Sequence, residues 1–263
     1  MDTQLSNKLA LVTGSTGGIG LAIAKSLVKE GASVIINGRS QESVDNAIAQ
    51  IASEGKGKVM GLAADLSSVE GVEKAIEKYP QLDILVNNLG IYEAKSFSEI
   101  TDEDWQNMFN INVMSGIRLS RAYFPKMLDK NWGRIIFISS DSAVQIPPDM
   151  IHYGMTKAAQ VTIARGLAEL TTNTAVTVNS LLVGPTRTKG VEDFIQNKAE
   201  QDKISIEEVE KNFFEDVRPG SLTERFIDPQ EVANLVTYVA SPLGSSINGA
   251  ALRIEGGLLK SAF

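Results

Sequence analysis

Three side chains in the middle of the sequence have the types and the spacing that proton transfer needs. Tyr153 and Lys157 stand four residues apart at the start of a long helical pattern, so they lie on one face of that helix. Ser140 ends an apolar run upstream of the tyrosine. A tyrosine hydroxyl can donate or accept a proton, a nearby ammonium favours its ionised form, and a serine hydroxyl can bind a substrate oxygen. We therefore treat these residues as a candidate reacting group.

A glycine-rich turn near the N-terminus is the second chemical signal. An apolar run leads directly into TGSTGGIG at 13–20, and a helical pattern with Ile19, Ile23 and Leu27 on one face follows. Glycines let the backbone turn sharply and approach a phosphate, while a helix N-terminus offers free N–H groups and a positive dipole end. A strand before the turn and a helix after it predict a dinucleotide pyrophosphate site rather than a simple tight turn. No Gly-Lys-Ser/Thr ends the loop, which argues against an NTPase P-loop. The expected cofactor contacts here are Gly14, Ser15, Thr16, Gly18, Ile19 and Gly20.

The end of the second apolar run bears on the choice of cofactor. An acidic residue there would bind a ribose 2′-hydroxyl and repel a 2′-phosphate, whereas an arginine suits the phosphate. Gly38 takes the acidic position, and Arg39 and Ser40 follow it. We predict NADP(H) in preference to NAD(H), with a solvated surface arginine as the alternative reading.

Three further polar residues each have two readings. Asp65, followed by Leu66, is placed to meet the adenine, but it could instead cap a helix because two serines follow. Asn112 interrupts an apolar helix stripe, and a buried amide without partners costs about 1–3 kcal/mol. His152 is the one histidine of the chain; neighbours on a helix point about 100° apart, so we do not expect it to share a target with Tyr153.

The elements that must position these residues alternate between strand and helix. Because the strands lack polar/apolar alternation, we expect them to be buried on both faces. The pattern predicts an α/β, doubly wound Rossmann-type fold, with a seven-stranded, mostly parallel sheet and helices on both faces. Ligands bind at the carboxyl ends of such strands, where Ser140 lies. The expected strands are 9–13, 33–37, 58–63, 82–87, 134–139, 175–181 and 251–255.

Helix starts are readable at Thr101 with Asp104, at Ser205 with Glu208, and at Asp228 before a proline. No repeat, low-complexity tract or flexible linker divides the chain, so residues 1–263 are predicted to form one domain. The segment 186–225, between the last two strands, departs from the regular alternation of strands and helices. It would hang over the carboxyl edge of the sheet, and we interpret it as a substrate lid, with a solvated helical excursion as the alternative.

Composition excludes several classes of function. The 263 residues include no cysteine and one histidine, which rules out disulfides and thiolate zinc sites, and no metal site is expected. Twenty-five basic against 32 acidic residues give a net charge of −7, without the excess that draws proteins to nucleic acid. The N-terminus is not a secretory signal and no apolar run is long enough to span a membrane, so a cytoplasmic protein is expected.

Taken together, these residues resemble the short-chain dehydrogenase/reductase family, in its compact single-domain form. The matches cover nearly the whole chain in order: TGSTGGIG (13–20), NNLG (87–90), Asn112, Ser140, the Y-x-x-x-K of Tyr153 and Lys157, and Gly184 with Thr188. Two departures lie beside the expected cofactor. Leu89 replaces the usual alanine of the Asn-Asn-Ala-Gly motif, and Val183-Gly184-Pro185 replaces the usual Pro-Gly.

The resemblance implies an NADP(H)-dependent carbonyl reductase or alcohol dehydrogenase. Tyr153 would be the general acid/base, Ser140 would bind the substrate oxygen, Lys157 would hold the nicotinamide ribose and lower the tyrosine pKa, and Asn112 would anchor a water. Lowering a tyrosine pKa from ~10 to neutrality needs roughly 4 kcal/mol, which the lysine ammonium and an oxidised nicotinamide ring about 4–6 Å away could supply together. Further cofactor contacts are expected at Asn88, Gly90, Gly184, Thr186 and Thr188.

Substrate identity is left open by the sequence. Apolar pocket walls are expected at Val144, Ile146, Pro147, Met150, Pro185, Val191, Phe194 and Phe213. These suit a small molecule of moderate size, and reduction of a β-ketoacyl thioester is one candidate activity. The family resemblance also implies a homotetramer or homodimer formed through the Asn112 and Tyr153 helices. The alternative function is a non-catalytic dinucleotide-binding sensor or scaffold on the same fold; a serine hydrolase lacks its G-x-S-x-G motif.

Overall fold

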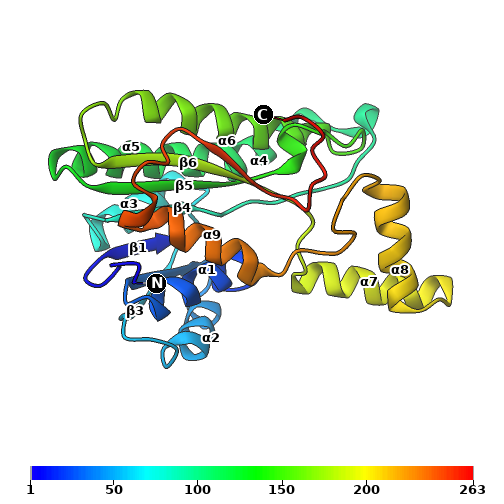
Figure 1. Ribbon diagram of the computed structural model, residues 1–263, viewed down its shortest axis with the longest axis horizontal. Coiled ribbons are helices and arrows are strands. Elements are labelled where there is room, and N and C mark those ends of the chain that lie inside the picture. The colour runs from blue at the N-terminus through cyan, green and yellow to red at the C-terminus, as the bar shows by residue number, and fades with distance from the viewer. Residues whose placement is uncertain (1, 263) are drawn as a thin grey trace.

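One parallel sheet organises the chain (Figure 1). The computed structural model describes residues 2–262, and within them every strand pairing is parallel, in the order β3-β2-β1-β4-β5-β6-β7. The order reverses between β1 and β4, which is the switch point where open α/β sheets bind ligands. The predicted fold is confirmed, and each strand lies within two residues of its expected position. The strands are β1 (Leu9–Val12), β2 (Ser33–Gly38), β3 (Val59–Ala63), β4 (Ile84–Asn87), β5 (Gly133–Ser140), β6 (Val176–Val183) and β7 (Ala251–Ile254).

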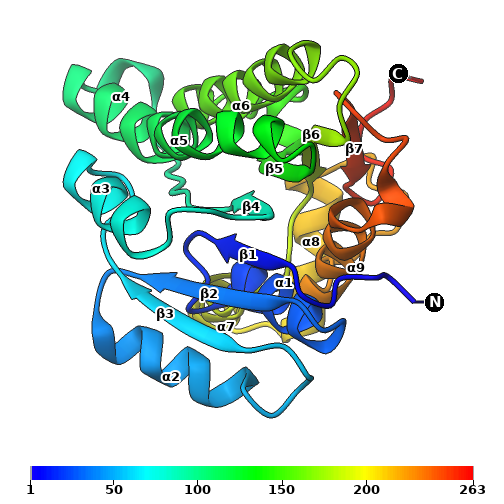
Figure 2. The ribbon, with the colours of Figure 1, turned by 90° about the vertical axis from the view of Figure 1, so that its left-hand side faces the viewer.

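Helices cover both faces of the sheet, as Figure 2 shows. Ala10 and Val12 of β1 pack on the side of α1 and α9, whereas Leu11 packs on the side of α5 and α6, and all three are fully buried. A strand buried on both faces has no position for a solvated side chain, which explains the missing polar/apolar alternation. The first layer holds α1 (Gly18–Lys29), α2 (Gln41–Ile51) and α9 (Pro229–Ala240); the second holds α3 (Val69–Lys78), α4 (Asp102–Phe109), α5 (Ser115–Asp129) and α6 (Ile151–Glu169).

The helix starts that the sequence predicts are present. Thr101 with Asp104 forms a reciprocal capping box at α4, Asp228 with Glu231 forms one at α9, and Ser205 accepts a hydrogen bond at the start of α8 (Ile206–Asn212). No helix among residues 2–262 has the length and apolar character to cross a membrane.

The segment 186–225 forms a small helical unit at one end of the sheet. It contains α7 (Lys189–Asp202), α8 and a π-helical turn at Phe213–Val217. In Figure 1, α7 and α8 stand apart from the helices that cover the sheet. The unit's apolar side chains Ile195, Ala199, Val209 and Phe214 form a separate cluster, which Phe226, just after the segment, completes.

A buried amide fixes the glycine-rich turn to the sheet. Asn37, at 2% exposure, accepts a hydrogen bond from the backbone N–H of Gly14 at 3.0 Å. Its amide nitrogen donates to the carbonyl oxygens of Leu62 at 3.1 Å and Ala64 at 3.0 Å. The Ser15 hydroxyl donates to the Val12 carbonyl oxygen at 2.7 Å. The turn is thus set by contacts to three strands rather than by its glycines alone.

Replacing this amide tests how much the anchoring contributes. Asn37→Leu keeps the size of the side chain but leaves three buried backbone groups without partners, so we expect the free energy of unfolding to fall by about 2–4 kcal/mol in urea titrations. Asn46→Leu on the exposed face of α2 is the control and should change it by less than about 0.5 kcal/mol. An Asn37→Leu protein as stable as the parent would contradict this account.

Candidate active site

The structure brings the three reacting candidates together at the carboxyl end of β5. Ser140 is the last residue of that strand, and Tyr153 and Lys157 lie in the first two turns of α6. The Tyr153 and Ser140 hydroxyls are hydrogen-bonded, and the Lys157 ammonium nitrogen lies 5.5 Å from the centre of the Tyr153 ring. The Ser140 hydroxyl donates to Asp141 Oδ1 at 2.7 Å. Tyr153, Ser140 and Asp141 therefore form a continuous chain of polar groups.

Lys157 is held by a partner that sequence reasoning missed. Its Nζ donates to the Ile138 carbonyl oxygen at 2.9 Å and to Gln160 Oε1 at 3.3 Å. The Gln160 amide nitrogen in turn donates to the Asn112 carbonyl oxygen at 2.6 Å. Burial of the lysine side chain lowers its pKa to about 8. A glutamine three residues after the lysine lies on the same helix face, and that spacing was the available signal.

The lowered tyrosine pKa that the resemblance implies depends on the charge of the nicotinamide as well as on that of Lys157, so it stays a prediction; in the chain by itself the shift has the opposite direction. Burial raises the pKa of Tyr153 to about 12; the hydrogen bond to Ser140 works against this rise, and the negative charge of Asp141 adds to it. The charge of Lys157 is not among the main causes of the shift. At neutral pH the tyrosine therefore holds its proton.

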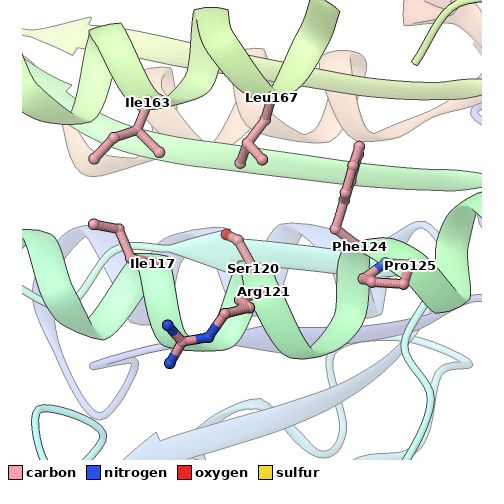
Figure 3. Close-up of a pocket in the computed structure, with 7 residues that line it drawn as sticks. All are labelled: Ile117, Ser120, Arg121, Phe124, Pro125, Ile163 and Leu167. Carbon is pink, nitrogen blue, oxygen red and sulfur yellow. The ribbon is translucent and has the colours of Figure 1, made fainter. Parts of the chain in front are cut away.

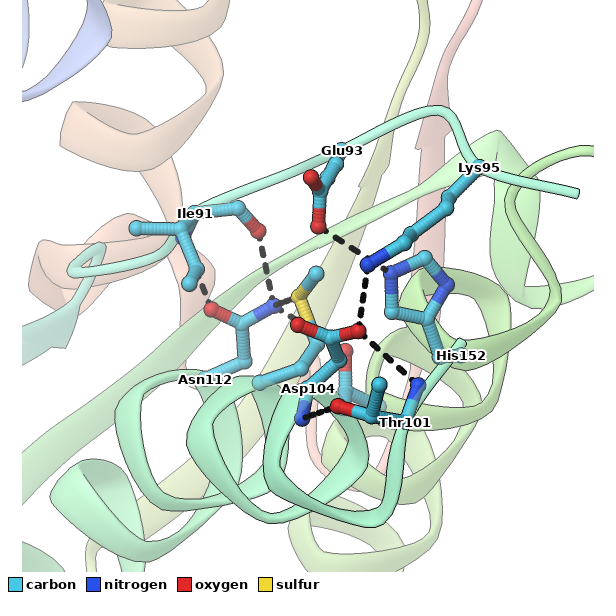
Figure 4. Close-up of polar contacts among 9 residues, drawn as sticks. Ile91, Glu93, Lys95, Thr101, Asp104, Asn112 and His152 are labelled. Carbon is cyan, nitrogen blue, oxygen red and sulfur yellow. Dashed lines mark hydrogen bonds and ion pairs between the residues drawn. The ribbon is translucent and has the colours of Figure 1, made fainter. Parts of the chain in front are cut away.

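Asn112 lies in a π-helical turn, Asn110–Met114, between α4 and α5, where the sequence suggested a plain helix stripe. It is 1% exposed, and its Oδ1 accepts from the Ile91 backbone N–H at 2.8 Å. Its amide nitrogen donates to the Ile91 carbonyl oxygen at 2.9 Å and to the Thr156 hydroxyl at 3.0 Å (Figure 4). The side chain thus fastens the loop after β4 to α6.

His152 is fully buried next to Tyr153 in sequence, but it packs elsewhere. Its ring packs edge-on against the Trp105 ring, with 5.8 Å between the ring centres, and its Nε2 lies 4.0 Å from Glu93 Oε2. Neither ring nitrogen has a hydrogen-bond partner among residues 2–262. This is consistent with the expectation that His152 and Tyr153 do not share a target.

The glycine-rich turn and the loop after β4 lie against each other. Gly14 and Gly18 have φ of +59° and +53°, and a Cβ at Gly20 would lie 2.5 Å from the Gly14 carbonyl oxygen. The Asn88 amide nitrogen donates to the carbonyl oxygens of Thr13 at 2.9 Å and Gly14 at 3.1 Å, which joins the two loops. These features fit a dinucleotide, since only backbone can approach a pyrophosphate so closely.

The other residues expected to bind the cofactor differ in their burial and in their contacts. Gly90 faces the lysine, because a Cβ there would lie 3.5 Å from Lys157 Nζ, and Gly18 faces Thr188. Arg39 and Ser40 are exposed after β2, and Ser40 also caps α2. Asp65 Oδ1 accepts from the backbone and hydroxyl of Ser67, and these bonds, with a contribution from the Arg39 charge, lower its pKa. Asp65 thus lies just before α3, whose N-cap is Ser68, so the helix cap offered as the alternative for Asp65 is wrong, and its contact with the adenine stays a prediction. The remaining positions, Ile19, Leu66, Gly184 and Thr186, are partly or fully buried near the strand ends.

The expected substrate walls are only partly assembled. Val144, Ile146 and Phe194 are each about half exposed, at 55%, 49% and 51%. Val191 and Phe213 pack against the apolar cluster of the segment 186–225. Phe194 lines a cavity of about 140 Å³ within that segment, and the Pro185 carbonyl oxygen accepts from the Ile227 N–H at 2.9 Å.

A larger cavity of about 260 Å³ lies between α5 and α6 and contains none of the reacting candidates; Ile117, Phe124, Ile163 and Leu167 line it (Figure 3).

Comparisons with known proteins agree with this geometry. The model of the short chain dehydrogenase family matches residues 8–199. An uncharacterized oxidoreductase of Bacillus subtilis (strain 168), YvaG, is 47% identical, with 100% of each chain covered. The 3-oxoacyl-[acyl-carrier-protein] reductase of Aquifex aeolicus is 33% identical over 98% of this chain and 100% of its own. The crystal structure of L-sorbose reductase from Gluconobacter frateurii, complexed with NADPH and L-sorbose, superposes with a TM-score of 0.92 at 30% identity, covering 99% of this chain and 100% of that one.

The low pKa of the buried lysine predicts a pH-dependent stability. The native lysine loses its proton near pH 8 and the unfolded one near 10.5, so between these values the unfolded state binds more protons and native stability rises with pH. Keeping the buried lysine charged lowers the free energy of unfolding by about 3 kcal/mol, and this loss is present in full below pH 8. Relative to Lys157→Met, the parent should thus gain stability as pH rises from 8 to 10.5 in urea titrations. A difference between the two that does not vary with pH would contradict the buried, shifted lysine.

Proposed function

The chain belongs to the short-chain dehydrogenase/reductase family, and from that premise we propose that this oxidoreductase is NADP(H)-dependent and interconverts a carbonyl and an alcohol, with Tyr153 as the general acid/base. The observation that supports the proposal most is the hydrogen-bonded pair of Tyr153 and Ser140 beside a buried Lys157. The nicotinamide, when bound, supplies or accepts the hydride. The protein's part is to bind the substrate oxygen and to move one proton.

The protonation state of the tyrosine favours reduction of the carbonyl. With a pKa raised to about 12, Tyr153 holds a proton at neutral pH and can donate it to the substrate oxygen as that oxygen gains negative charge. Ser140 hydrogen-bonds the same oxygen, and Lys157 holds the nicotinamide ribose. Asn112 supports the proton path through its carbonyl oxygen, to which Gln160 links the lysine. Oxidation of an alcohol needs the tyrosine to lose its proton first, so it should require higher pH.

Two larger features complete the proposal. The segment 186–225 acts as a lid over the carboxyl edge of the sheet, supported by its position after β6 and by its separate apolar cluster. The apolar groove between α5 and α6 is the surface through which two copies associate into a dimer or tetramer, because five of the seven side chains that line it are apolar, the other two being Ser120 and Arg121.

Tyr153→Phe tests the acid/base role. The variant keeps the ring but removes the proton, so we expect NADPH oxidation with an accepted ketone to fall at least about 100-fold in kcat. Cofactor binding, followed by calorimetry, should stay within a few-fold of the parent. Turnover near that of the parent would remove Tyr153 from the mechanism. A parent protein that binds NADPH but oxidises it with no carbonyl of a broad panel would instead indicate the sensor or scaffold.

Arg39→Gln tests the choice of cofactor. Loss of a charge-assisted contact to the 2′-phosphate, worth about 1.5–3 kcal/mol, should lower kcat/KM for NADPH by about 10- to 100-fold and leave that for NADH nearly unchanged. Arg165→Gln, an exposed arginine of α6 paired with Glu169, is the control and should preserve the preference. Equal use of NADPH and NADH by the parent protein would refute the assignment.

A further inference from the structure

Two charged side chains beside the reacting group leave a donor and an acceptor unsatisfied. Asp141 is 3% exposed, and its Oδ1 accepts from the Ser140 hydroxyl at 2.7 Å and from the Ser142 backbone N–H at 2.9 Å. Its other oxygen, Oδ2, is buried without a hydrogen-bond partner in the part of the chain that is described. Arg218 Nε is also buried without a hydrogen-bond partner among the described residues, and it lies 3.7 Å from Asp141 Oδ2. This distance is too long for a hydrogen bond.

The pair lies beside the candidate reacting residues. Asp141 directly follows Ser140, and Arg218 ends the π-helical turn of the segment 186–225, so the pair joins the reacting edge to the lid. Both charges reach the Tyr153 hydroxyl: Asp141 raises the pKa of that tyrosine and Arg218 lowers it. The pair is therefore near the hydroxyl group that would donate the proton.

A buried donor or acceptor without a partner costs about 1–3 kcal/mol, and one hydroxyl group can satisfy both. Its oxygen accepts from Arg218 Nε, and its hydrogen is donated to Asp141 Oδ2. Resting on the function proposed above, we propose that Asp141 and Arg218 bind a hydroxyl group of the substrate on a carbon near the reacting carbonyl. The substrates are then neutral hydroxy ketones, including ketoses, rather than plain ketones or oxo acids.

The local charge argues against a substrate carboxylate at this point. Asp141 already offsets the single positive charge of Arg218. Glu255, 6% exposed, adds a second negative charge close enough to raise the pKa of Asp141. An oxo acid would bring a third carboxylate toward one guanidinium, whereas a hydroxyl group brings no charge.

Three matched four-carbon substrates test the proposal: 1-hydroxy-2-butanone, 2-butanone and 2-oxobutanoate, each with NADPH. The parent enzyme should show a kcat/KM for the hydroxy ketone at least about 10-fold above the other two, because a site built for a hydroxyl group rejects analogues without it. Asp141→Asn replaces the acceptor by a donor and should bring the hydroxy ketone and the plain ketone within about 3-fold. It should also raise the relative rate with the oxo acid. Because the two ketones are compared with the same variant, the ratio of their kcat/KM values cancels any effect that the variant has on Ser140.

Arg218→Gln, in the partly exposed lid segment, provides an independent variant and should also lose the preference. Lys211→Gln is the matched control, since this lid cation pairs with Glu215 at the surface, and it should keep the preference. A parent enzyme that reduces the hydroxy and plain ketones equally, or a preference that survives both site variants, would overturn the proposal and indicate that water bridges the pair. No NADPH oxidation with these substrates or any wider carbonyl panel would overturn the proposed function as well, which separates the two failures.

Discussion

Burial of every central strand on both faces is the constraint on which the rest of the molecule depends. Leu11 packs on one helical layer and its neighbours Ala10 and Val12 on the other, so the sheet has no solvated face that could carry polar chemistry. Polar side chains can then act only where the strands end. All strands run in parallel, so their carboxyl ends meet at one edge, and the glycine-rich turn, the β4 loop and Ser140 all gather there.

Buried amides hold that edge in shape. Asn37 ties the glycine-rich turn to β3, Asn88 joins that turn to the loop after β4, and Asn112 fastens the β4 loop to α6. Each amide offers both donors and acceptors, so each can satisfy backbone groups that no strand or helix pairs.

Burial also sets the chemistry of the reacting residues. It raises the pKa of Tyr153 to about 12 and lowers that of Lys157 to about 8, so in the protein alone the tyrosine is neutral at pH 7 and the lysine loses its charge at a lower pH than a solvated lysine does. The tyrosine is thereby kept as a proton donor. Asp141 is buried at the same place, and it connects this centre to the segment 186–225 through Arg218. The segment 186–225 and the hydroxyls of Ser140 and Tyr153 are therefore connected by a run of polar and charged groups.

The sequence by itself determined the order of strands and helices, the glycine-rich turn, and the grouping of Ser140, Tyr153 and Lys157, because these depend on local periodicity and short spacing. It also predicted the helix caps, which involve neighbouring residues only. Only the tertiary structure decided the π-helical turn at Asn112, the link from Gln160 to the Asn112 carbonyl, the high tyrosine pKa and the Asp141–Arg218 pair. Asp141 and Arg218 are 77 positions apart, and no pattern along the chain indicates which charges meet or how far water is excluded from them.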